Sequence, residues 1–314
     1  MILLVVNAIV PLGCVLMLGV WIKSRRLVPP DFWRGLEWVS YWVLMPALLV
    51  SVIMRAPDLS VPWFDLLTTL YGTLAILSLF LWAAWQLGLH RQGFPRFTSL
   101  YQGVIRFNTF IALALMAGLD RSLLSHVAIA AACIIVVINV LCVSLMSLQG
   151  DRRGALPRIV NELRRNPLIL ACLLGAVCRQ LGIPAESVVG ESLRLIGQAA
   201  LPMGILVLGA GLQAEAMRRA FVTTSLSIGL QFLVKPLVGV GLALSMGLDI
   251  HWVLVVLVVF SVPTAPSSYI LAKQLGGDAP AMAAIVASQT LLALFTIPVT
   301  LLLAASMGVI RLGS

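Results

Sequence analysis

The chain has 314 residues, of which 61% are hydrophobic and only 11% are charged, against about 25% charged residues in an ordinary soluble domain. This composition excludes a soluble globular protein and predicts a membrane domain over nearly the whole chain. The net charge of +9 does not indicate a nucleic-acid partner, because the basic residues stand in short clusters between apolar runs.

Ten apolar segments follow one another along the chain, separated by charged residues or by Pro and Gly. A membrane-spanning helix needs about 17 to 25 mostly apolar residues. The sequence therefore predicts an all-α polytopic protein with ten transmembrane helices in the lipid bilayer. The predicted spans are 2–22, 36–54, 64–88, 97–117, 122–148, 166–182, 189–212, 221–246, 252–273 and 279–306.

Lys and Arg are unequally divided between alternate loops, and cytoplasmic loops retain such residues. With the N-terminus outside, 14 fall on the cytoplasmic side: Lys23, Arg25, Arg26, Arg34, Arg91, Arg96, Arg152, Arg153, Arg158, Arg164, Arg165, Arg218, Arg219 and Lys273. The outer side then has 5: Arg55, Arg121, Arg179, Arg194 and Arg311. This bias predicts that both termini lie outside.

The longest connection divides the chain into a first unit of five spans (1–148), a basic cytoplasmic linker (149–165) and a second unit of five spans (166–314). Three pairs of residues recur at an offset of 156: Pro11 and Pro167, Gly19 and Gly175, Pro46 and Pro202. Because each unit has an odd number of spans, the second copy must enter the membrane from the opposite side. The sequence thus predicts two inverted repeats, which is a transporter architecture.

The same offset aligns two helix-breaking sequences in the middle of spans four and nine. Pro263 and Pro266 lack a backbone N–H, Thr264 is expected to cap the helix that restarts after it, and Asn108 is a good helix cap. A lone break would be read as an ordinary kink, whereas two equivalent breaks favour a binding site between crossing helices. The candidate substrate-binding residues are Asn108, Arg106, Thr109, Pro263, Thr264, Ala265, Pro266 and Ser267.

Two cations, Arg106 and Lys235, fall inside spans, whereas all twelve acidic residues lie in loops or near span ends. With no carboxylate to pair them, and with helix N-termini adding positive potential, the site is expected to attract an anion, most simply a carboxylate. The alternatives are that Arg106 reaches one membrane surface and that Lys235, as a coupling or structural cation, bonds backbone carbonyls freed at a break.

Other polar residues within spans are candidates to line the cavity, although such residues singly more often bond a neighbouring helix. They are Gln102, Asn139, Gln289 and Thr290. The five Cys residues stand in apolar segments without metal-ligand spacing, so no metal site and no cofactor are predicted.

Several motifs together resemble the auxin efflux carrier (AEC) family of transporters, and among its members the bacterial malonate and malate permeases. The resemblance covers nearly the whole chain. It rests on 26–28 (RLV), 32–33 (FW), 45–49 (MPALL), 106–109 (RFNT), 166–170 (NPLIL), 200–202 (ALP), 209–212 (GAGL), 263–267 (PTAPS) and 276–278 (GGD).

The resemblance implies ten spans with crossing broken helices 4 and 9, and an elevator-type motion of spans 3–5 and 8–10. These would move against a scaffold of spans 1, 2, 6 and 7, through which family members often form a homodimer. It also implies that Asn108 contacts the substrate carboxylate. Plant members carry a Pro where this chain has Phe107, and they have a long hydrophilic central loop where this chain has a short basic one.

The sequence therefore predicts a secondary active transporter of small organic anions in a bacterial-type inner membrane. The alternative is an intramembrane enzyme acting on a lipid, but such an enzyme would usually show clustered Asp, or His with acids, at membrane level. The chain has no GxxxxGK[ST] loop for ATP-driven transport. Substrate identity, direction, coupling ion and oligomeric state stay open.

Overall fold

The computed structural model describes residues 2–56, 61–148, 164–212 and 220–310. These residues form helices and no strand, which confirms the all-α fold class for the described part of the chain. Within the described residues, eight helical stretches are long and apolar enough to cross a membrane, and two shorter apolar helices cover Pro167–Gln180 and Ile250–Ser261. Most of the predicted linker, together with Arg218 and Arg219, lies outside the described residues.

The helices follow the predicted segments in order, with several segments divided in two. The first half contains α1 (Ile2–Ser24), α2 (Pro30–Val39), η1 (Ser40–Leu44), α3 (Met45–Met54), α4 (Trp63–Leu87), η2 (Leu89–Gln92), α5 (Phe94–Ile105), α6 (Thr109–Leu119), η3 (Arg121–Leu123) and α7 (Leu124–Ser147). The second half contains α9 (Pro167–Gln180), α10 (Val188–Gln198), α11 (Ala200–Gly211), α12 (Phe221–Gly229), η6 (Leu230–Val234), α13 (Lys235–Ser245), α14 (Ile250–Ser261), α15 (Ser267–Gln274) and α16 (Ala279–Ser306).

Two of these spans contain a short π-helical turn just before a proline. Met45 N–H bonds the carbonyl of Ser40, and Lys235 N–H bonds that of Leu230, five residues back in each case. The following residues, Pro46 and Pro236, have no N–H to continue the regular ladder. The widened turn therefore keeps each span continuous past its proline, and such turns are frequent at functional sites.

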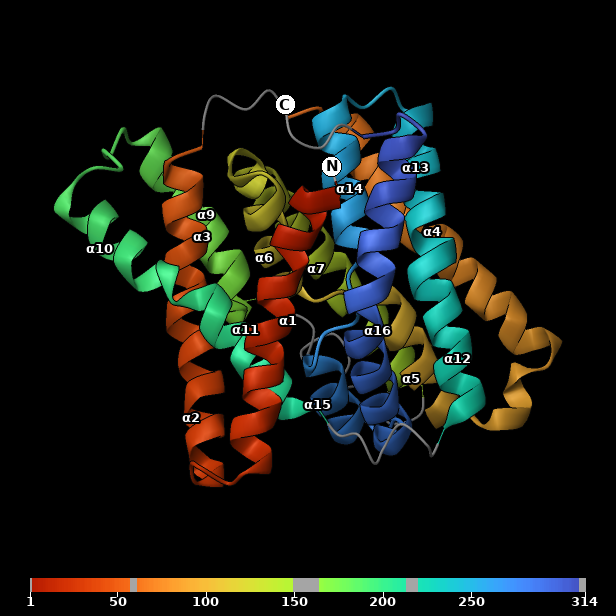
Figure 1. Ribbon diagram of the computed structural model, residues 1–314. Coiled ribbons are helices and arrows are strands. Elements are labelled where there is room, and N and C mark those ends of the chain that lie inside the picture. The colour runs from red at the N-terminus through yellow and green to blue at the C-terminus, as the bar shows by residue number, and fades with distance from the viewer. Residues whose placement is uncertain (1, 57–60, 149–163, 213–219, 311–314) are drawn as a thin grey trace.

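The helices sort into two groups that lie side by side (Figure 1). In one group α1 packs along α11, and α3 packs against α9 and α10. In the other group α4 to α7 and α12 to α16 pack on one another. The groups meet where α1 and α11 contact α6, where α1 contacts α16, and where α7 contacts α3 and α9. The first group corresponds to spans 1, 2, 6 and 7, and the second to spans 3–5 and 8–10.

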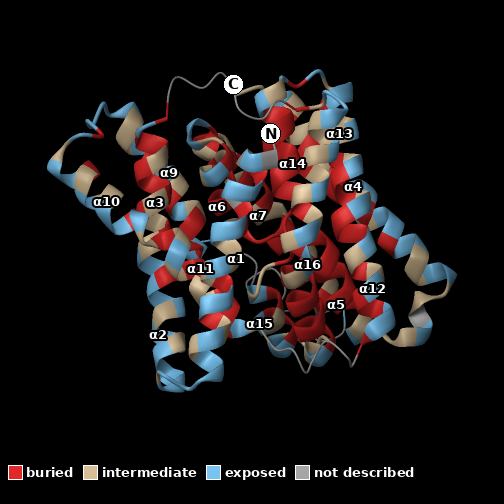
Figure 2. Cartoon of the chain, viewed as in Figure 1, coloured by how far each residue is buried: buried red, intermediate tan, exposed pale blue. Residues whose placement is uncertain are grey.

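The most buried helices are those of the second group that contain or border the two breaks (Figure 2). Every residue of α14 from Trp252 to Ser261 is buried, and so is every residue of α5 from Phe97 to Ile105. A helix that is apolar and covered all round belongs at the centre of a bundle. The two broken spans thus lie at the core, with the first half of α16 beside them.

Two glycine contacts in the first group are related by the offset of 156 residues. A Cβ added to Gly19 would collide with the backbone carbonyl of Leu206, and one added to Gly175 would press on the backbone of Val50. Gly175 is Gly19 plus 156, and Leu206 is Val50 plus 156. Each half therefore presents an equivalent glycine to the equivalent backbone turn of the other half.

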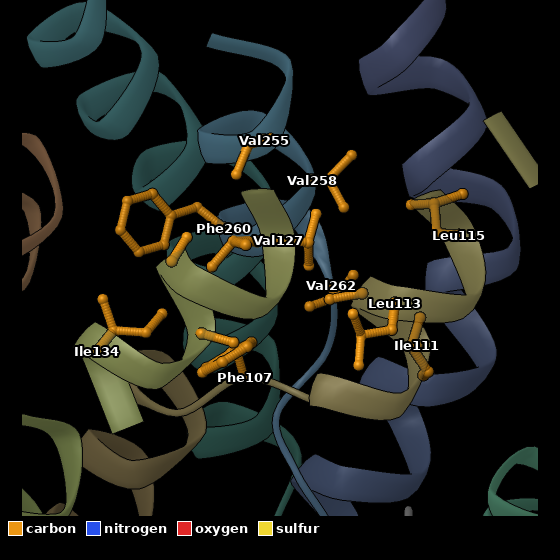
Figure 3. Close-up of a cluster of buried hydrophobic side chains, with 14 of the residues drawn as sticks. Phe107, Ile111, Leu113, Leu115, Val127, Ile134, Val255, Val258, Phe260 and Val262 are labelled. Carbon is orange, nitrogen blue, oxygen red and sulfur yellow. The ribbon is translucent and has the colours of Figure 1, made fainter. Parts of the chain in front are cut away.

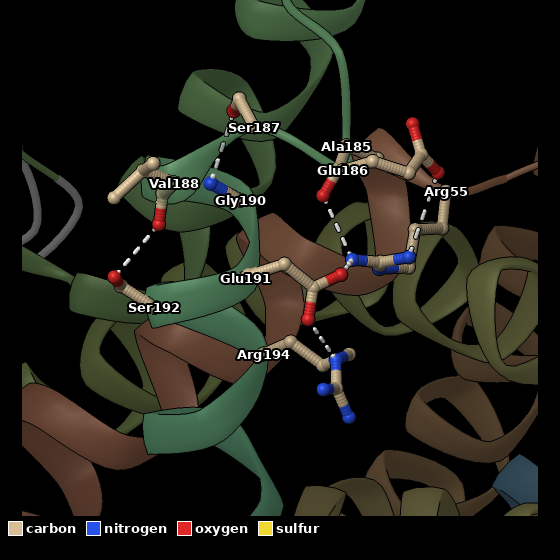
Figure 4. Close-up of polar contacts among 9 residues, drawn as sticks. All are labelled: Arg55, Ala185, Glu186, Ser187, Val188, Gly190, Glu191, Ser192 and Arg194. Carbon is tan, nitrogen blue, oxygen red and sulfur yellow. Dashed lines mark hydrogen bonds and ion pairs between the residues drawn. The ribbon is translucent and has the colours of Figure 1, made fainter.

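An ion-pair network fixes the end of α3 to the start of α10 (Figure 4). Arg55 donates to the carbonyl of Ala185 at 2.7 Å and to Glu191 Oε1 at 2.5 Å. The Nη1 of Arg55 lies 3.7 Å from Glu186 Oε1. Glu191 Oε2 in turn accepts from Arg194 Nε at 2.6 Å. These contacts lie within the first group of helices.

Candidate functional site

The two breaks touch each other through their backbones. The chain leaves α5 after Ile105 and starts α6 at Thr109, and it leaves α14 after Ser261 and starts α15 at Ser267. Between them, Asn108 N–H donates to the carbonyl of Pro263 at 2.8 Å. This bond joins the two non-helical segments into one crossing.

Local chemistry explains each break. Val262 is extended, because a residue that precedes proline avoids the helical conformation. Asn108 is also extended, and its Oδ1 accepts from Ile111 N–H at 3.2 Å, which caps α6. Asn108 is 1% exposed, and within the described structure its Nδ2 has no hydrogen-bond partner. The residue therefore holds the helix start with one side-chain atom and leaves a buried donor free.

Phe107, which stands where plant members have Pro, is anchored on the apolar side of the break (Figure 3). It is 5% exposed and belongs to one buried cluster with Val127 and Ile134 of α7 and Phe260 of α14. Burial of an aromatic side chain of this size is strongly favourable. Phe107 thus fixes the break on its apolar side, while its neighbours Arg106 and Asn108 carry the polar groups of the crossing.

Arg106 extends across the crossing and finds only neutral partners. Its Nη1 donates to Asn139 Oδ1 at 3.2 Å, and its Nη2 donates to Ser267 Oγ at 3.2 Å. Its Nε is buried without a partner, and within the described residues it makes no ion pair. The Arg106 guanidinium thus joins the first break to Asn139 of α7 and to Ser267 at the second break. No carboxylate among the described residues pairs with its charge.

The predicted site residues differ in accessibility. Arg106, Thr109, Ala265 and Pro266 are partly exposed and Ser267 is exposed, whereas Pro263 is buried. A guanidinium at membrane depth needs protein or water around it rather than lipid. The accessible side of the crossing is therefore the side on which a polar ligand can approach.

Thr264 is buried, and both its backbone N–H and its hydroxyl form hydrogen bonds within the protein. Its N–H donates to Gln289 Oε1 at 2.8 Å, and its Oγ1 bonds the carbonyl of Gln102 at 3.2 Å and Ser268 Oγ at 3.1 Å. The expectation that Thr264 caps α15 is wrong, because Pro266 is the N-cap and no side chain caps it. Pro266 has no backbone N–H for Thr264 to cap, and the Thr264 hydroxyl bonds the side chain of Ser268 and the carbonyl of Gln102 instead.

Gln289 holds the crossing from α16. Besides accepting from Thr264, its Nε2 donates to the carbonyl of Gly103 at 2.9 Å and to Ser227 Oγ at 2.8 Å. The side chain of Gln102, one turn before the first break, is 0% exposed and has no partner for either polar atom in the described structure. The two glutamines thus differ, since one is satisfied and the other is not.

Lys235 lies on the buried side of the crossing. Its Nζ donates to the carbonyls of Val104 at 2.8 Å, Ile105 at 3.2 Å and Arg106 at 3.0 Å, and to Gln231 Oε1 at 3.2 Å. This arrangement matches the alternative in which the lysine bonds carbonyls freed at a break. Gln231 was not among the residues predicted from the sequence, although a second polar residue four positions before an intramembrane lysine was a signal for it.

Thr290 lies apart from this polar network, in a small apolar cavity between the two groups of helices. The cavity is lined by Ile9, Leu12, Leu16, Ile111, Leu115, Ile205, Thr290, Ala293, Leu294 and Ile297. The Thr290 hydroxyl is buried there with no partner among the described residues. In the same part of the chain, no cluster of His, Cys, Asp or Glu has the size that a metal ion needs.

Comparison with known proteins bears on the second half of the chain. Residues 154–301 match the model of a family described as membrane transport protein, a stretch slightly shorter than half of the chain. A search of curated proteins found no match. The family consists of membrane transporters rather than enzymes, and the match supports the resemblance drawn from the motifs. Together with the apolar helices, it indicates that this chain is an integral membrane transporter.

Proposed function

We propose that this protein is a secondary active transporter of small organic anions, and that it binds the carboxylate of its substrate at the crossing of the α5–α6 and α14–α15 breaks. The observation that carries the proposal is Arg106, a cation at the crossing whose hydrogen-bond partners are the neutral oxygens of Asn139 and Ser267. An uncompensated cation at membrane depth is costly. A bound carboxylate removes that cost.

The other free groups at the crossing suit the same ligand. Arg106 Nε and Asn108 Nδ2 are buried donors without partners among the described residues. The N-terminus of α6 adds positive potential from its helix dipole. A carboxylate is an acceptor-only group with two oxygens, so it can accept from several such donors at once. We assign Arg106, Asn108, Thr109 and Ser267 to direct contact with it.

The remaining predicted residues shape the crossing in this scheme. Thr264 and Gln289 hold the second break in place through the bonds described above, and Pro263, Ala265 and Pro266 keep it non-helical. Asn139 orients the Arg106 guanidinium. Gln102 lies one turn before the first break, and both polar atoms of its side chain are free in the described structure. In this scheme it is an additional hydrogen-bond donor and acceptor for the substrate.

We further propose that transport proceeds by an elevator-type movement of the second group of helices against the first. The separate packing of the two groups supports this, and the paired glycine contacts at Gly19 and Gly175 support two inverted five-helix repeats. In this scheme the protein is a bacterial-type family member of the inner membrane, both termini lie outside, and a homodimer forms through the first group.

Uptake into proteoliposomes tests the function. A panel of radiolabelled mono- and dicarboxylates is offered with pH and sodium gradients imposed separately. We expect saturable uptake of at least one carboxylate, competed by other carboxylates and not by the corresponding neutral amides. Equal competition by carboxylates and amides would contradict an anion site at Arg106, as would the absence of uptake for every anion in the panel.

A further inference from the structure

Three backbone carbonyls at the C-terminal end of α5, together with one side-chain oxygen, surround a single buried cation. Lys235 is 0% exposed. Its Nζ lies within 2.8 to 3.2 Å of the carbonyls of Val104, Ile105 and Arg106 and of Gln231 Oε1. The Nζ also lies over the ring of Phe260, 5.6 Å from the ring centroid. An ammonium group has three donors and no acceptor, so this environment suits its charged form.

Such an environment has the composition of a site for an alkali cation. Rings of backbone carbonyls replace the hydration shell of monovalent ions in channels. In transporters with broken helices, the C-terminal ends of the half-helices and the unwound carbonyls hold the coupling cation. Here the same position at the end of α5 contains the Lys235 ammonium, and no carboxylate in the described part of the chain pairs with it.

The end of the other half-helix is also occupied by a side chain from the same helical turn. Gln231 Nε2 donates to the carbonyl of Val262, just after α14, at 2.5 Å and to that of Phe260, in the last turn of α14, at 3.5 Å. Gln231 and Lys235 are four residues apart, on η6 and at the start of α13. One polar turn therefore supplies donors to both half-helices, an amide to one and an ammonium to the other.

We propose that these four oxygens form a monovalent-cation site that the Lys235 ammonium occupies permanently, so that this protein binds no sodium ion at the crossing. The site follows from the geometry around Nζ. Its consequence for transport, independence from a sodium gradient, rests on the proposed function. The tests below therefore measure ion binding and thermal stability, and their results do not depend on finding the substrate.

The first test uses the wild-type protein in detergent or nanodiscs. Radioactive sodium is titrated at constant ionic strength, with choline as the replacement, and the melting temperature is followed by tryptophan fluorescence. We expect no saturable sodium binding and the same melting temperature in sodium and in choline. Saturable binding, or a melting temperature raised by sodium alone, would overturn the proposal without recourse to any variant.

The second test empties the site. Lys235→Ala should lower the melting temperature in choline, and sodium or n-butylammonium should recover most of that loss, because either cation can enter the vacated oxygen cage. Lys235→Met, which fills the space with an uncharged chain, should be destabilised without recovery. Lys273→Ala, the same change at an exposed lysine in the last turn of α15, should respond to none of the cations.

Two results would contradict the proposal. One is a folded Lys235→Ala protein whose stability is the same in sodium, n-butylammonium and choline. The other is a Lys235→Ala protein that cannot be purified in any of these cations, because the proposal requires that an external cation replace the ammonium.

Discussion

The guanidinium of Arg106 bridges the two breaks and α7 through Asn139 and Ser267. Both partners are neutral, so the charge of Arg106 is available to a ligand rather than consumed within the protein. The residue also ends α5, since its backbone turns to an extended conformation. Charge and break thus coincide at one residue, which makes its substitution the most direct test of the anion site.

We expect Arg106→Gln to lower the affinity for a carboxylate substrate by about ten- to a hundredfold, because a hydrogen bond to a charged group typically contributes about 1.5 to 3 kcal/mol. Calorimetric titration of the purified variant measures this. Arg34→Gln is the matched control, since Arg34 pairs with Asp31 in an exposed salt bridge on α2 and should bind as wild type does. Unchanged affinity in Arg106→Gln would assign that residue a structural role alone.

Asn108 offers a second test, because its two side-chain atoms have separate tasks. Its Oδ1 caps α6, while its Nδ2 is free in the described structure. Asn108→Ala removes both, at a cost of about 1 kcal/mol for the cap and about 1 kcal/mol for the lost bond to substrate. Asn108→Asp keeps the capping oxygen but places a negative charge beside the substrate carboxylate, so it should bind more weakly than Asn108→Ala.

The control for Asn108 is another asparagine cap. Asn166 caps α9 by accepting from Leu168 N–H at 3.0 Å and Ile169 N–H at 3.3 Å. Asn166→Ala should lose a similar amount of stability and retain the wild-type affinity. Thermal melts and carboxylate titrations of the three variants separate the two effects. Equal binding by Asn108→Asp and the wild type would place the substrate elsewhere.

At the level of the helical elements, the crossing is held by side chains from helices that do not themselves break. Gln289 of α16 satisfies one N–H of the second break, one carbonyl of α5 and the hydroxyl of Ser227 on α12. Lys235 at the start of α13 and Gln231 of η6 satisfy the ends of α5 and α14. Buried backbone groups that leave a helix need such partners.

Gln289→Leu should therefore destabilise the protein strongly. It leaves the buried N–H of Thr264 and the carbonyl of Gly103 without the amide that satisfies them, and each such group costs about 1 to 3 kcal/mol. The melting temperature of the purified variant measures the loss. Gln274→Leu, at the exposed end of α15, makes the same chemical change and should melt as wild type does. A small effect at Gln289 would mean that water or another group replaces its bonds.

The sequence was sufficient to locate the breaks but not to identify what holds them. Pro263, Pro266 and Asn108 are local signals, since each acts on its own backbone. The partner of Thr264 could not be predicted in the same way, because Gln289 is 25 residues away and reaches it only once α16 has packed. For the same reason Thr264 was expected to cap α15, whereas its hydroxyl bonds a carbonyl of α5 instead.

Lys235 illustrates how far local reasoning extends. Its position inside an apolar span indicated either a site for an anion or bonds to freed carbonyls, and the sequence could not decide between them. The carbonyls that Lys235 bonds lie 129 to 131 residues away in the sequence, at the end of α5. Only the folded bundle brings them to the lysine. A buried cation surrounded by backbone oxygens is thus a property of the assembled bundle rather than of the span that carries it.

On the scale of the whole molecule, the contact between the two groups of helices contains one close fit near the crossing. A Cβ added to Gly204 of α11 would collide with the ring of Phe110, which follows the first break on α6. The two residues belong to different groups. The small apolar cavity between α1, α11, α6 and α16 lies at the same interface, where sliding of one group past the other requires few polar bonds to break.

If the groups move against each other during transport, a covalent link across this interface must stop it. In a background without the native Cys residues, Phe110→Cys with Gly204→Cys should form a disulfide under mild oxidation, abolish carboxylate uptake, and recover uptake on reduction. Ile53→Cys with Gly175→Cys links two residues of the first group, where a Cβ at position 175 would lie 3.0 Å from the Cβ of Ile53, and should leave uptake unchanged. Uptake that persists when the first of these double variants is fully oxidised would rule out relative motion at this contact, because α6 and α11 would then keep one position throughout the transport cycle.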